Sequence, residues 1–295
     1  EGKVYTFHLR QGMKWSDGRP LTADDWVFWY DEMVMNDELT PVKPAFMKIG
    51  GELGKLMKVD DYTVRVPFAK PYGMFIEQLQ TADLYAPAHY LKQFLPKYAD
   101  KATLDKLMKD GSYQRWMDLF GALNTIGDNP DLPVLQGWVA LDRFTTPVQR
   151  YQRNPYYWKV DTAGNQLPYI DYLEFSEIPV ETIVLKAVAG EIDLQNRHLS
   201  SIANYQMFVE NEKKGDYRLV FGVAPGLNLG AIYLNFFHPN QAIAKTFRDI
   251  RFRQALSHAI NRDEINQMLY KGLAIPSQQA PSKGDPWYEE KYGKI

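Results

Sequence analysis

The polar segment Gln195-Asn-Arg-His198 places two amides, a guanidinium and an imidazole on consecutive residues, which together offer hydrogen-bond donors and acceptors to a ligand. It directly follows Ile192-Asp-Leu194, for which we predict a short strand. Ligands of open α/β sheets lie beyond the carboxyl ends of strands. Asn196, Arg197 and His198 are therefore candidate ligand-binding residues, and an ordinary solvated loop is the alternative interpretation.

The carboxylate pairs and histidines do not form a recognisable catalytic or metal-binding pattern. Asp24-Asp25 follows Thr22 in the first turn of a predicted helix, where carboxylates cap the helix and interact favourably with its dipole. Asp161-Thr-Ala-Gly-Asn165 lacks the later acidic ligand of a calcium loop, so a turn is predicted there. The histidines are too far apart for a helical zinc site; they are His8, His89, His198, His238 and His258.

Other reactive motifs are also missing from the sequence. Cysteine is absent, which removes disulfides, thiolate metal ligands and cysteine nucleophiles. The sequence contains no nucleophile elbow, no Walker loop and no glycine-rich dinucleotide fingerprint. We therefore predict no catalytic residues, no metal site and no cofactor.

The elements that position these residues are predicted from periodicity and punctuation. Residues 5–10 alternate as a half-buried strand, Asp17-Gly18 marks a turn, and Thr22 caps a buried helix that ends before Pro41. Further helices are expected at 73–82, 87–95, 100–120, 181–188, 203–212, 250–260 and 262–270, and further strands at 62–68, 138–144, 147–153, 172–175, 192–194, 217–223 and 230–237. This alternation predicts an α/β or α+β chain with mixed sheets.

Length and charge exclude several classes of protein. A chain of 295 residues is long enough for two domains. Its 34 basic and 36 acidic residues nearly balance, so the basic footprint of a nucleic-acid-binding protein is absent. No apolar run approaches the ~20 residues of a membrane-spanning helix. Aromatic residues are plentiful, at 19 Tyr, 15 Phe and 7 Trp; most are expected in the core, although such side chains also line ligand pockets.

Three segments, in this order, resemble the extracellular solute-binding protein family 5, which serves ABC importers of peptides, nickel and oligosaccharides. They are Tyr5-Thr-Phe-His-Leu-Arg10 with Trp15-Ser-Asp-Gly18 and Leu21-Thr-Ala-Asp-Asp25, then Gly190-Glu-Ile-Asp193, and finally Asp249-Ile-Arg-Phe-Arg-Gln-Ala-Leu256 with Ala259-Ile-Asn-Arg-Asp-Glu264. The sequence departs from the family pattern at Leu135-Gln-Gly-Trp138 and at Asn261. The resemblance extends from Tyr5 to about Ser277.

The resemblance implies an α/β fold of the periplasmic-binding-protein type II, in its large three-domain subgroup, with mixed sheets and incomplete lobes. It divides the chain into a small accessory domain at 1–85, part of the main lobe at 86–226 and the start of the second lobe at 227–295. Because members of this family commonly exceed five hundred residues, we expect the chain to be a truncated fragment. The resemblance also places Asn228 and Asn235 on the cleft side of the strand that crosses to the second lobe.

The implied function is capture of a small-molecule or peptide ligand between two lobes and its delivery to the membrane permease of an ABC transporter, without an enzymatic step. Oligopeptides are the first choice of solute, because they are the commonest ligands of the family, and oligosaccharides are the alternative. A monomer in the periplasm or outside the cell is expected, with no nucleic-acid partner and with a lipid anchor in a missing N-terminal segment as an open option. A hydrolase of glycosidic or peptide bonds is the alternative from another class, and it requires a pair of carboxylates or a nucleophile–base pair in a cleft.

Overall fold

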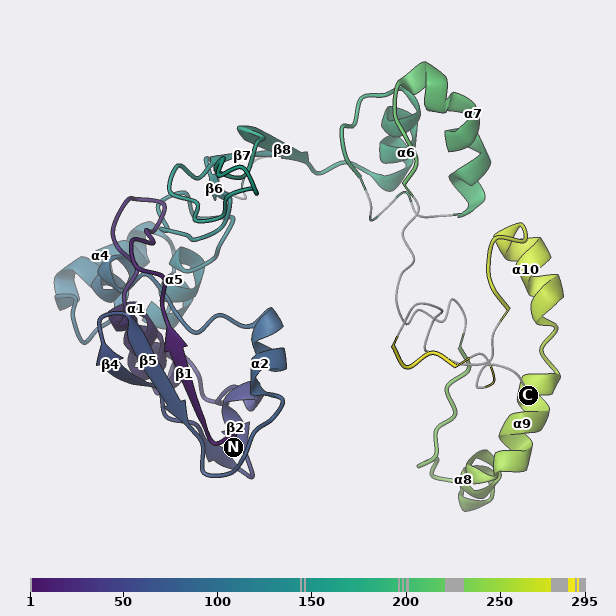
Figure 1. The fold of residues 1–295 in the computed structure, drawn as a ribbon, viewed down its shortest axis with the longest axis horizontal. Helices are drawn as coiled ribbons and strands as arrows, with labels where there is room; N and C mark the ends of the chain where they lie inside the picture. Colours follow the sequence, from purple (N-terminus) through teal and green to yellow (C-terminus); the bar gives the residue numbers. More distant parts are fainter. Residues whose placement is uncertain are drawn as a thin grey trace. The chain divides into compact units, whose positions relative to one another are not determined.

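The computed structural model describes residues 2–143, 145, 147–195, 197, 199, 202–220, 231–276, 286–289 and 291. The chain divides into two compact units, residues 1–177 and 178–295, and each is described by itself (Figure 1). The boundary between these units falls inside the middle segment of the three-domain division expected from the sequence. The boundaries expected near 85 and 226 stay predictions.

The N-terminal unit begins with a three-stranded antiparallel sheet in the order β1-β5-β4 (Figure 1). Its strands are β1 (Val4–His8), β4 (Met57–Asp60) and β5 (Thr63–Pro67). Tyr5 pairs with Val66 and Phe7 pairs with Val64, so the apolar positions of both strands face the core together. The strands predicted near 5–10 and 62–68 are confirmed. The terminal position of Pro67 explains how proline is tolerated in the central strand.

The first helix starts where the sequence predicts. In α1 (Ala23–Phe28), Thr22 is the N-cap and forms the reciprocal capping box with Asp25. The helix continues directly as a π-helical segment, η1 (Trp29–Val34), which the periodicity did not predict. In segments of this kind each backbone hydrogen bond spans one residue more than in an α-helix. Three of its side chains, Trp29, Tyr30 and Val34, are buried.

Short helices surround one large hydrophobic core. They are α2 (Phe75–Gln78), α3 (Ala88–Leu91), α4 (Lys101–Asp110) and α5 (Trp116–Leu123). Helices α2, α3 and α4 lie in ranges predicted to be helical, whereas the range predicted at 100–120 is divided into two helices, of which α5 continues to Leu123. The core joins Phe28, Val66, Phe75, Leu91 and Phe120 into a single cluster. Full burial of such side chains contributes roughly 1.5–3 kcal/mol each, so this cluster is the main stabilising element of the unit.

A second sheet completes the N-terminal unit. Strands β6 (Trp138–Ala140), β7 (Val148–Arg153) and β8 (Tyr172–Ser176) pair antiparallel in that order, as predicted for three separate ranges. A two-residue hairpin, β2 (Lys48–Ile49) and β3 (Glu52–Leu53), lies apart from both sheets. Directly after β7, Asn154 is fully buried and its amide donates to the carbonyl oxygen of Gln136 at 2.9 Å.

The described part of residues 178–295 is helical. It contains α6 (Val180–Val188), η5 (Ile202–Asn204), α7 (Tyr205–Gly215), α8 (Gln241–Arg248), α9 (Ile250–His258) and α10 (Arg262–Tyr270). Helices α6 and α7 pack against each other. Gly190, just after α6, has a φ of +76°, and a Cβ there would lie 2.2 Å from the carbonyl oxygen of Gly215. Only glycine fits this close approach.

Several predictions for the second half of the chain are wrong. Residues 192–194, 217–220 and 231–235 form no strand, and 236–237 form a turn; the remainder of the ranges predicted as 217–223 and 230–237 lies outside the described residues. Apolar alternation predicts a strand only where a neighbouring strand completes its hydrogen bonds. Helix α8 was not predicted, although Asn240 caps it by accepting a hydrogen bond from the amide of Ala242 at 2.9 Å.

Candidate functional site

The structure describes two of the five predicted ligand-binding residues, Arg197 and Asn235. Asn196, His198 and Asn228 lie outside the described residues. Arg197 is exposed, and its backbone amide donates to the side-chain oxygen of Gln195 at 2.9 Å. Asn235 is exposed, and its side-chain oxygen accepts from the amide of Phe237 at 3.0 Å, which forms a local turn. A single site formed by the five residues stays a prediction.

An open groove of about 590 Å³ runs along the end of β1 in the N-terminal unit. It is lined by Thr6, Phe7, His8, Leu9, Arg10, Met13, Leu21, Trp26, Tyr85, Leu135 and Trp158. Its walls are mostly apolar and aromatic, and the groove therefore has the general character of a surface that binds partly apolar molecules. The sequence alone does not predict this groove, because the lining residues come from segments that are far apart in the chain.

One wall of this groove is fixed by a contact between Arg10 and Trp158. The guanidinium carbon lies 5.4 Å from the centre of the indole ring, and Nη1 donates to the carbonyl oxygen of Trp158 at 3.4 Å. Lys159 lies 5.1 Å from the same ring, and Lys14 lies 5.3 Å from the ring of Tyr156. Cations placed over aromatic faces in this way are attracted by about 0.5–1 kcal/mol at exposed positions.

A second depression of about 380 Å³ lies beside the β6-β7-β8 sheet. It is lined by Ile126, Gly127, Asn129, Leu132, Val134, Gln136, Trp138, Ala140, Tyr151, Leu173 and Phe175. The hydroxyl of Tyr151 donates to the carbonyl oxygen of Gly127 at 2.8 Å, and burial raises the pKa of this tyrosine. Among the described residues that line this depression, none is a carboxylate or a histidine.

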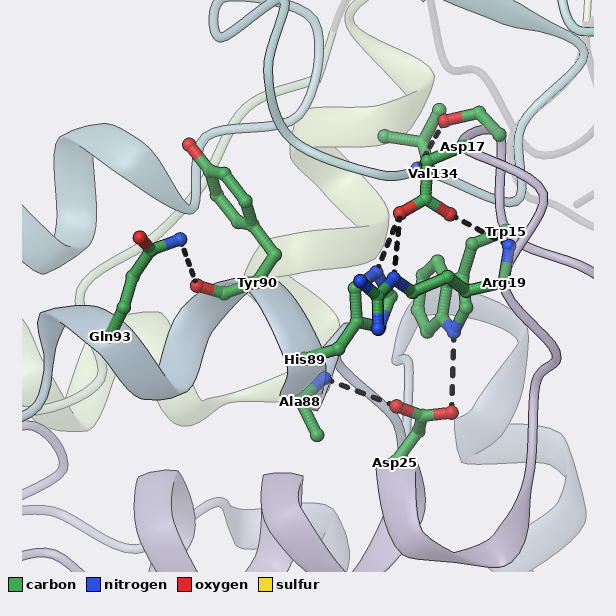
Figure 2. Close-up of polar contacts among 10 residues, drawn as sticks. Trp15, Asp17, Arg19, Asp25, Ala88, His89, Tyr90, Gln93 and Val134 are labelled. Carbon is green, nitrogen blue, oxygen red and sulfur yellow. Dashed lines mark hydrogen bonds and ion pairs between the residues drawn. The ribbon is translucent and has the colours of Figure 1, made fainter. Parts of the chain in front are cut away.

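The buried carboxylate of Asp25 holds three segments together (Figure 2). Its Oδ2 accepts from Trp15 Nε1 at 3.2 Å and from the amide of Thr22 at 3.1 Å, and its Oδ1 accepts from the amide of Ala88 at 3.1 Å. Burial raises the pKa of Asp25, and these hydrogen bonds partly oppose that rise. Both carboxylate oxygens of Asp25 accept hydrogen bonds that hold the fold, which agrees with the predicted capping role. The neighbouring Asp24 forms an ion pair with Lys58 at 2.9 Å.

Asp17 and His89, whose side chains are partly exposed, form a pair next to this buried carboxylate (Figure 2). Asp17 Oδ2 lies 2.8 Å from His89 Nε2 and 4.0 Å from Arg19 Nε. The indole ring of Trp15 makes an edge-to-face contact with the His89 ring, with 6.3 Å between the ring centres. The sequence predicts a turn at Asp17-Gly18 but does not pair Asp17 with His89, because 72 positions separate the two residues.

Among the described residues, no three His, Asp or Glu side chains gather closely enough to hold a metal ion.

The turn predicted at 161–165 is confirmed. Asp161 Oδ1 accepts from the amides of Ala163 and Asn165, both at 2.8 Å, and Oδ2 accepts from the Tyr169 hydroxyl at 2.5 Å. The bond from Tyr169 is the largest of the causes that lower the pKa of Asp161 to about 2.

The helices of the described part of the chain are all too short or too polar to cross a bilayer.

The chain belongs to the bacterial extracellular solute-binding proteins, family 5, whose model matches residues 1–294. It is 31% identical over 296 residues to the periplasmic α-galactoside-binding protein of Rhizobium meliloti strain 1021, covering 92% of this chain and 38% of that protein. It is 28% identical to the dipeptide-binding protein of Escherichia coli K12, covering 94% of this chain and 46% of that protein. The resemblance found in the sequence is thereby confirmed.

Solved structures agree with this family. The oligopeptide-binding protein OppA matches with a TM-score of 0.85 and 44% identity, over 98% of this chain and 46% of that one. The periplasmic binding protein MelB of Agrobacterium fabrum C58, in complex with stachyose, matches with a TM-score of 0.61 and 28% identity, over 98% and 42%. The fold is that of a family 5 periplasmic binding protein, and the chain spans less than half the length of these relatives.

Proposed function

We propose that this chain is part of the solute-binding component of an ABC importer and that its solute is an oligopeptide. The observation that carries the proposal is the family match over residues 1–294. The choice of peptide is supported by the 44% identity to a protein described as oligopeptide-binding. The partner is the membrane permease of the importer, the location is periplasmic or extracellular, and no bond of the solute is broken.

The mechanism proposed is closure of two lobes on the solute, as in other periplasmic binding proteins. Residues 86–226 belong to the main lobe and residues 227–295 begin the second lobe, with 1–85 as the accessory domain. An extended peptide in the closed cleft would pair with backbone groups, which gives affinity without selecting one sequence. Asn196, Arg197 and His198 are proposed contacts because they offer amide, guanidinium and imidazole groups to a ligand. Asn228 and Asn235 are proposed contacts because the family resemblance implies a position on the cleft side for them.

An oligosaccharide is the second candidate, and it has its own support. One relative is described as α-galactoside-binding, and one similar solved structure holds stachyose. Aromatic side chains stack on sugar rings in many sites, and this chain carries 41 aromatic residues among its 295 (19 Tyr, 15 Phe and 7 Trp). The two candidates differ in what the cleft must recognise, which is a peptide backbone in one case and sugar hydroxyls in the other.

Binding to the complete protein separates these candidates. The protein is unfolded and refolded to remove any bound ligand, and calorimetric titrations then use short peptides of several lengths, raffinose and stachyose. Heat from the peptides alone supports the first proposal, and heat from the galactosides alone supports the second. Turnover of either panel, detected by mass spectrometry of the recovered ligand, would overturn both.

Variants test the proposed contacts in the same titrations. Arg197→Ala and Asn235→Ala are expected to weaken binding by about tenfold each, the effect of losing a hydrogen bond to a charged or polar ligand group. Lys109→Ala, an exposed change on α4 in the other unit, is the matched control and should leave the affinity unchanged. Unchanged affinity in both test variants removes these residues from the site while leaving the family function intact.

A further inference from the structure

The chain contains two Asp-Gly pairs, Asp17-Gly18 and Asp110-Gly111. In such a pair the glycine nitrogen can attack the side-chain carboxyl carbon of the aspartate, because glycine has no side chain to hinder the approach. A C–N bond forms and one water molecule leaves, which gives a five-membered succinimide. Water then adds to either carbonyl of the ring and breaks one of its C–N bonds, so that the product is aspartate or isoaspartate. The sequence makes both pairs candidates for this modification.

Contacts at both carboxyl oxygens restrain the side chain of Asp17 (Figure 2). Its Oδ1 accepts a hydrogen bond from the amide of Arg19 at 3.0 Å, and its Oδ2 lies 2.8 Å from Nε2 of His89, on α3. The His89 ring is itself held in an edge-to-face contact with Trp15, whose side chain is almost fully buried. Attack by the glycine nitrogen requires the carboxyl group to rotate, and this rotation would weaken both contacts.

The backbone of the turn at residues 14–20 is closed as well. Lys14 forms a bridge with Pro20, and the amide of Trp15 donates to the carbonyl oxygen of Arg19 at 2.8 Å. The amide of Gly18, which contains the attacking nitrogen, donates to the carbonyl oxygen of Trp15 at 2.9 Å. An amide engaged in this way has to leave its hydrogen bond before it reacts, so succinimide formation here requires local opening of the turn.

The pair Asp110-Gly111 has a different environment, at the carboxyl end of α4. Asp110 is the last residue of this helix and is exposed, and its side chain makes no hydrogen bond or ion pair with the other residues that the structure describes. The amide of Gly111 donates to the carbonyl oxygens of Leu107 and Lys109. These backbone bonds at the helix end are therefore the main restraint on the reaction at position 110.

Two features make this end of α4 easier to open than the turn at residues 14–20. Leu104 is buried, whereas the other residues of the helix are exposed or partly exposed. Ser112, directly after the pair, has a φ of +59°, in the left-handed region that is unfavourable for residues other than glycine. Helix ends fray readily, and segments with few buried contacts open locally at a low free-energy cost.

We propose that Asp110-Gly111 is a site of spontaneous isoaspartate formation and that the contacts of Asp17 protect Asp17-Gly18 from the same reaction. Isoaspartate adds one methylene group to the main chain. At position 110 the added group lies at the end of an exposed helix. At position 17 it would lengthen the turn that carries Trp15 and displace the indole from the buried carboxylate of Asp25. The protected pair is the one whose modification would damage the fold, and this inference is independent of the proposed solute.

Incubation of the complete protein in warm neutral buffer tests this proposal. Samples taken over several weeks are digested, and electron-transfer fragmentation of the peptides distinguishes isoaspartate from aspartate at each position. Isoaspartate should accumulate about tenfold faster at position 110 than at position 17, which is the effect expected of hydrogen bonds to a carboxyl group. Equal rates, or a faster reaction at position 17, would overturn the proposal.

The same incubation in concentrated urea shows whether the fold causes the difference. In the unfolded chain both pairs lose their restraints, so their rates should become similar. A preference for position 110 that persists in urea would come from the neighbouring residues in the sequence, and it would overturn the protective role of the fold. This comparison needs no variant and therefore does not depend on the folding of one.

Two variants test the individual assignments, with circular dichroism as the check that each is folded. His89→Ala removes one of the two contacts of Asp17, so the rate at position 17 should rise about two- to fivefold while the rate at position 110 stays the same. An unchanged rate at position 17 would contradict the role given to His89. In Asp110→Glu the ring would need six members, so the modification at position 110 should disappear. A modification that remains in that peptide would contradict its assignment to Asp110.

Discussion

The indole nitrogen of Trp15 donates a hydrogen bond to the carboxylate of Asp25 at 3.2 Å, and both side chains are almost fully buried, with exposed fractions of 2% and 4%. The same carboxylate caps α1 and accepts from the first amide of α3, so one side chain is hydrogen-bonded to the turn at residues 14–20 and to two helices. A single buried acceptor therefore organises this corner of the N-terminal unit.

Replacing Asp25 with alanine is expected to lower the free energy of unfolding of the N-terminal unit by about 3 kcal/mol. The substitution leaves the donors of Trp15, Thr22 and Ala88 without their acceptor, and each buried unsatisfied donor costs roughly 1–3 kcal/mol. Urea denaturation followed by tryptophan fluorescence measures the change. Asp24→Ala is the matched control, because Asp24 is exposed and forms an ion pair worth less than about 1 kcal/mol. Equal losses in both variants would contradict the role given to Asp25.

The pH dependence of stability should carry the signature of the raised pKa of Asp25. A carboxyl whose pKa is higher in the folded than in the unfolded protein stabilises the fold fully below the unfolded value, 3.8, and loses this contribution as the pH rises through the folded value. The wild type should therefore lose stability relative to Asp25→Asn as the pH increases from below 4 towards neutrality. Denaturation of both proteins at a series of pH values gives the difference directly. A gain in the stability of the wild type relative to Asp25→Asn as the pH rises would contradict the raised pKa of Asp25.

Asp161 should show the opposite dependence. Its pKa is lowered to about 2, so its contribution is present above 3.8 and is lost as the pH falls through about 2. Thermal melts of the wild type and of Asp161→Asn should therefore converge as the pH falls from 4 to 2. In Tyr169→Phe, which removes the largest cause of the lowered pKa, the carboxyl group should titrate at higher pH by NMR. A titration at the same pH as in the wild type would show that the hydroxyl has no influence.

Gly190→Ala is expected to destabilise the packing of α6 against α7. The new Cβ would lie 2.2 Å from the carbonyl oxygen of Gly215, and a φ of +76° is unfavourable for alanine. We expect a loss of about 2–4 kcal/mol in the unfolding of residues 178–295, seen as faster hydrogen exchange in α6 and α7. Gly164→Ala is the control, since φ is +88° there but no atom lies within 4 Å of the new Cβ. Its cost should be that of the backbone alone, about 1 kcal/mol.

Local patterns predicted much of the N-terminal unit. The capping box at Thr22, the alternation in β1 and the Asp161 turn each depend on residues within a few positions of one another, so their sequence signals are complete. For the strands expected at 217–223 and 230–237, the sequence supplied apolar alternation but no information about a partner strand. Apolar alternation indicates that one face of a segment is buried. It does not show whether another segment will pair with it to form a strand.

The candidate site was harder to predict for the same reason. Arg10 and Trp158 meet across 148 positions of sequence, and Asp17 and His89 meet across 72. No spacing rule connects such residues, because only the folded chain brings these distant segments together. The loop predicted at 195–198 depends on residue types that follow an expected strand, and residues 192–194 form no strand.

The contact between Gly18 and the Tyr156 ring has an evolutionary consequence. A side chain at position 18 and an aromatic ring at position 156 compete for the same space, since a Cβ would lie 3.0 Å from the ring. Orthologues should therefore change the two positions together: those that lose the glycine should carry a smaller residue in place of the tyrosine. In orthologues that keep both the glycine and the tyrosine, insertions in other loops should be tolerated more readily than a substitution at position 18 or 156.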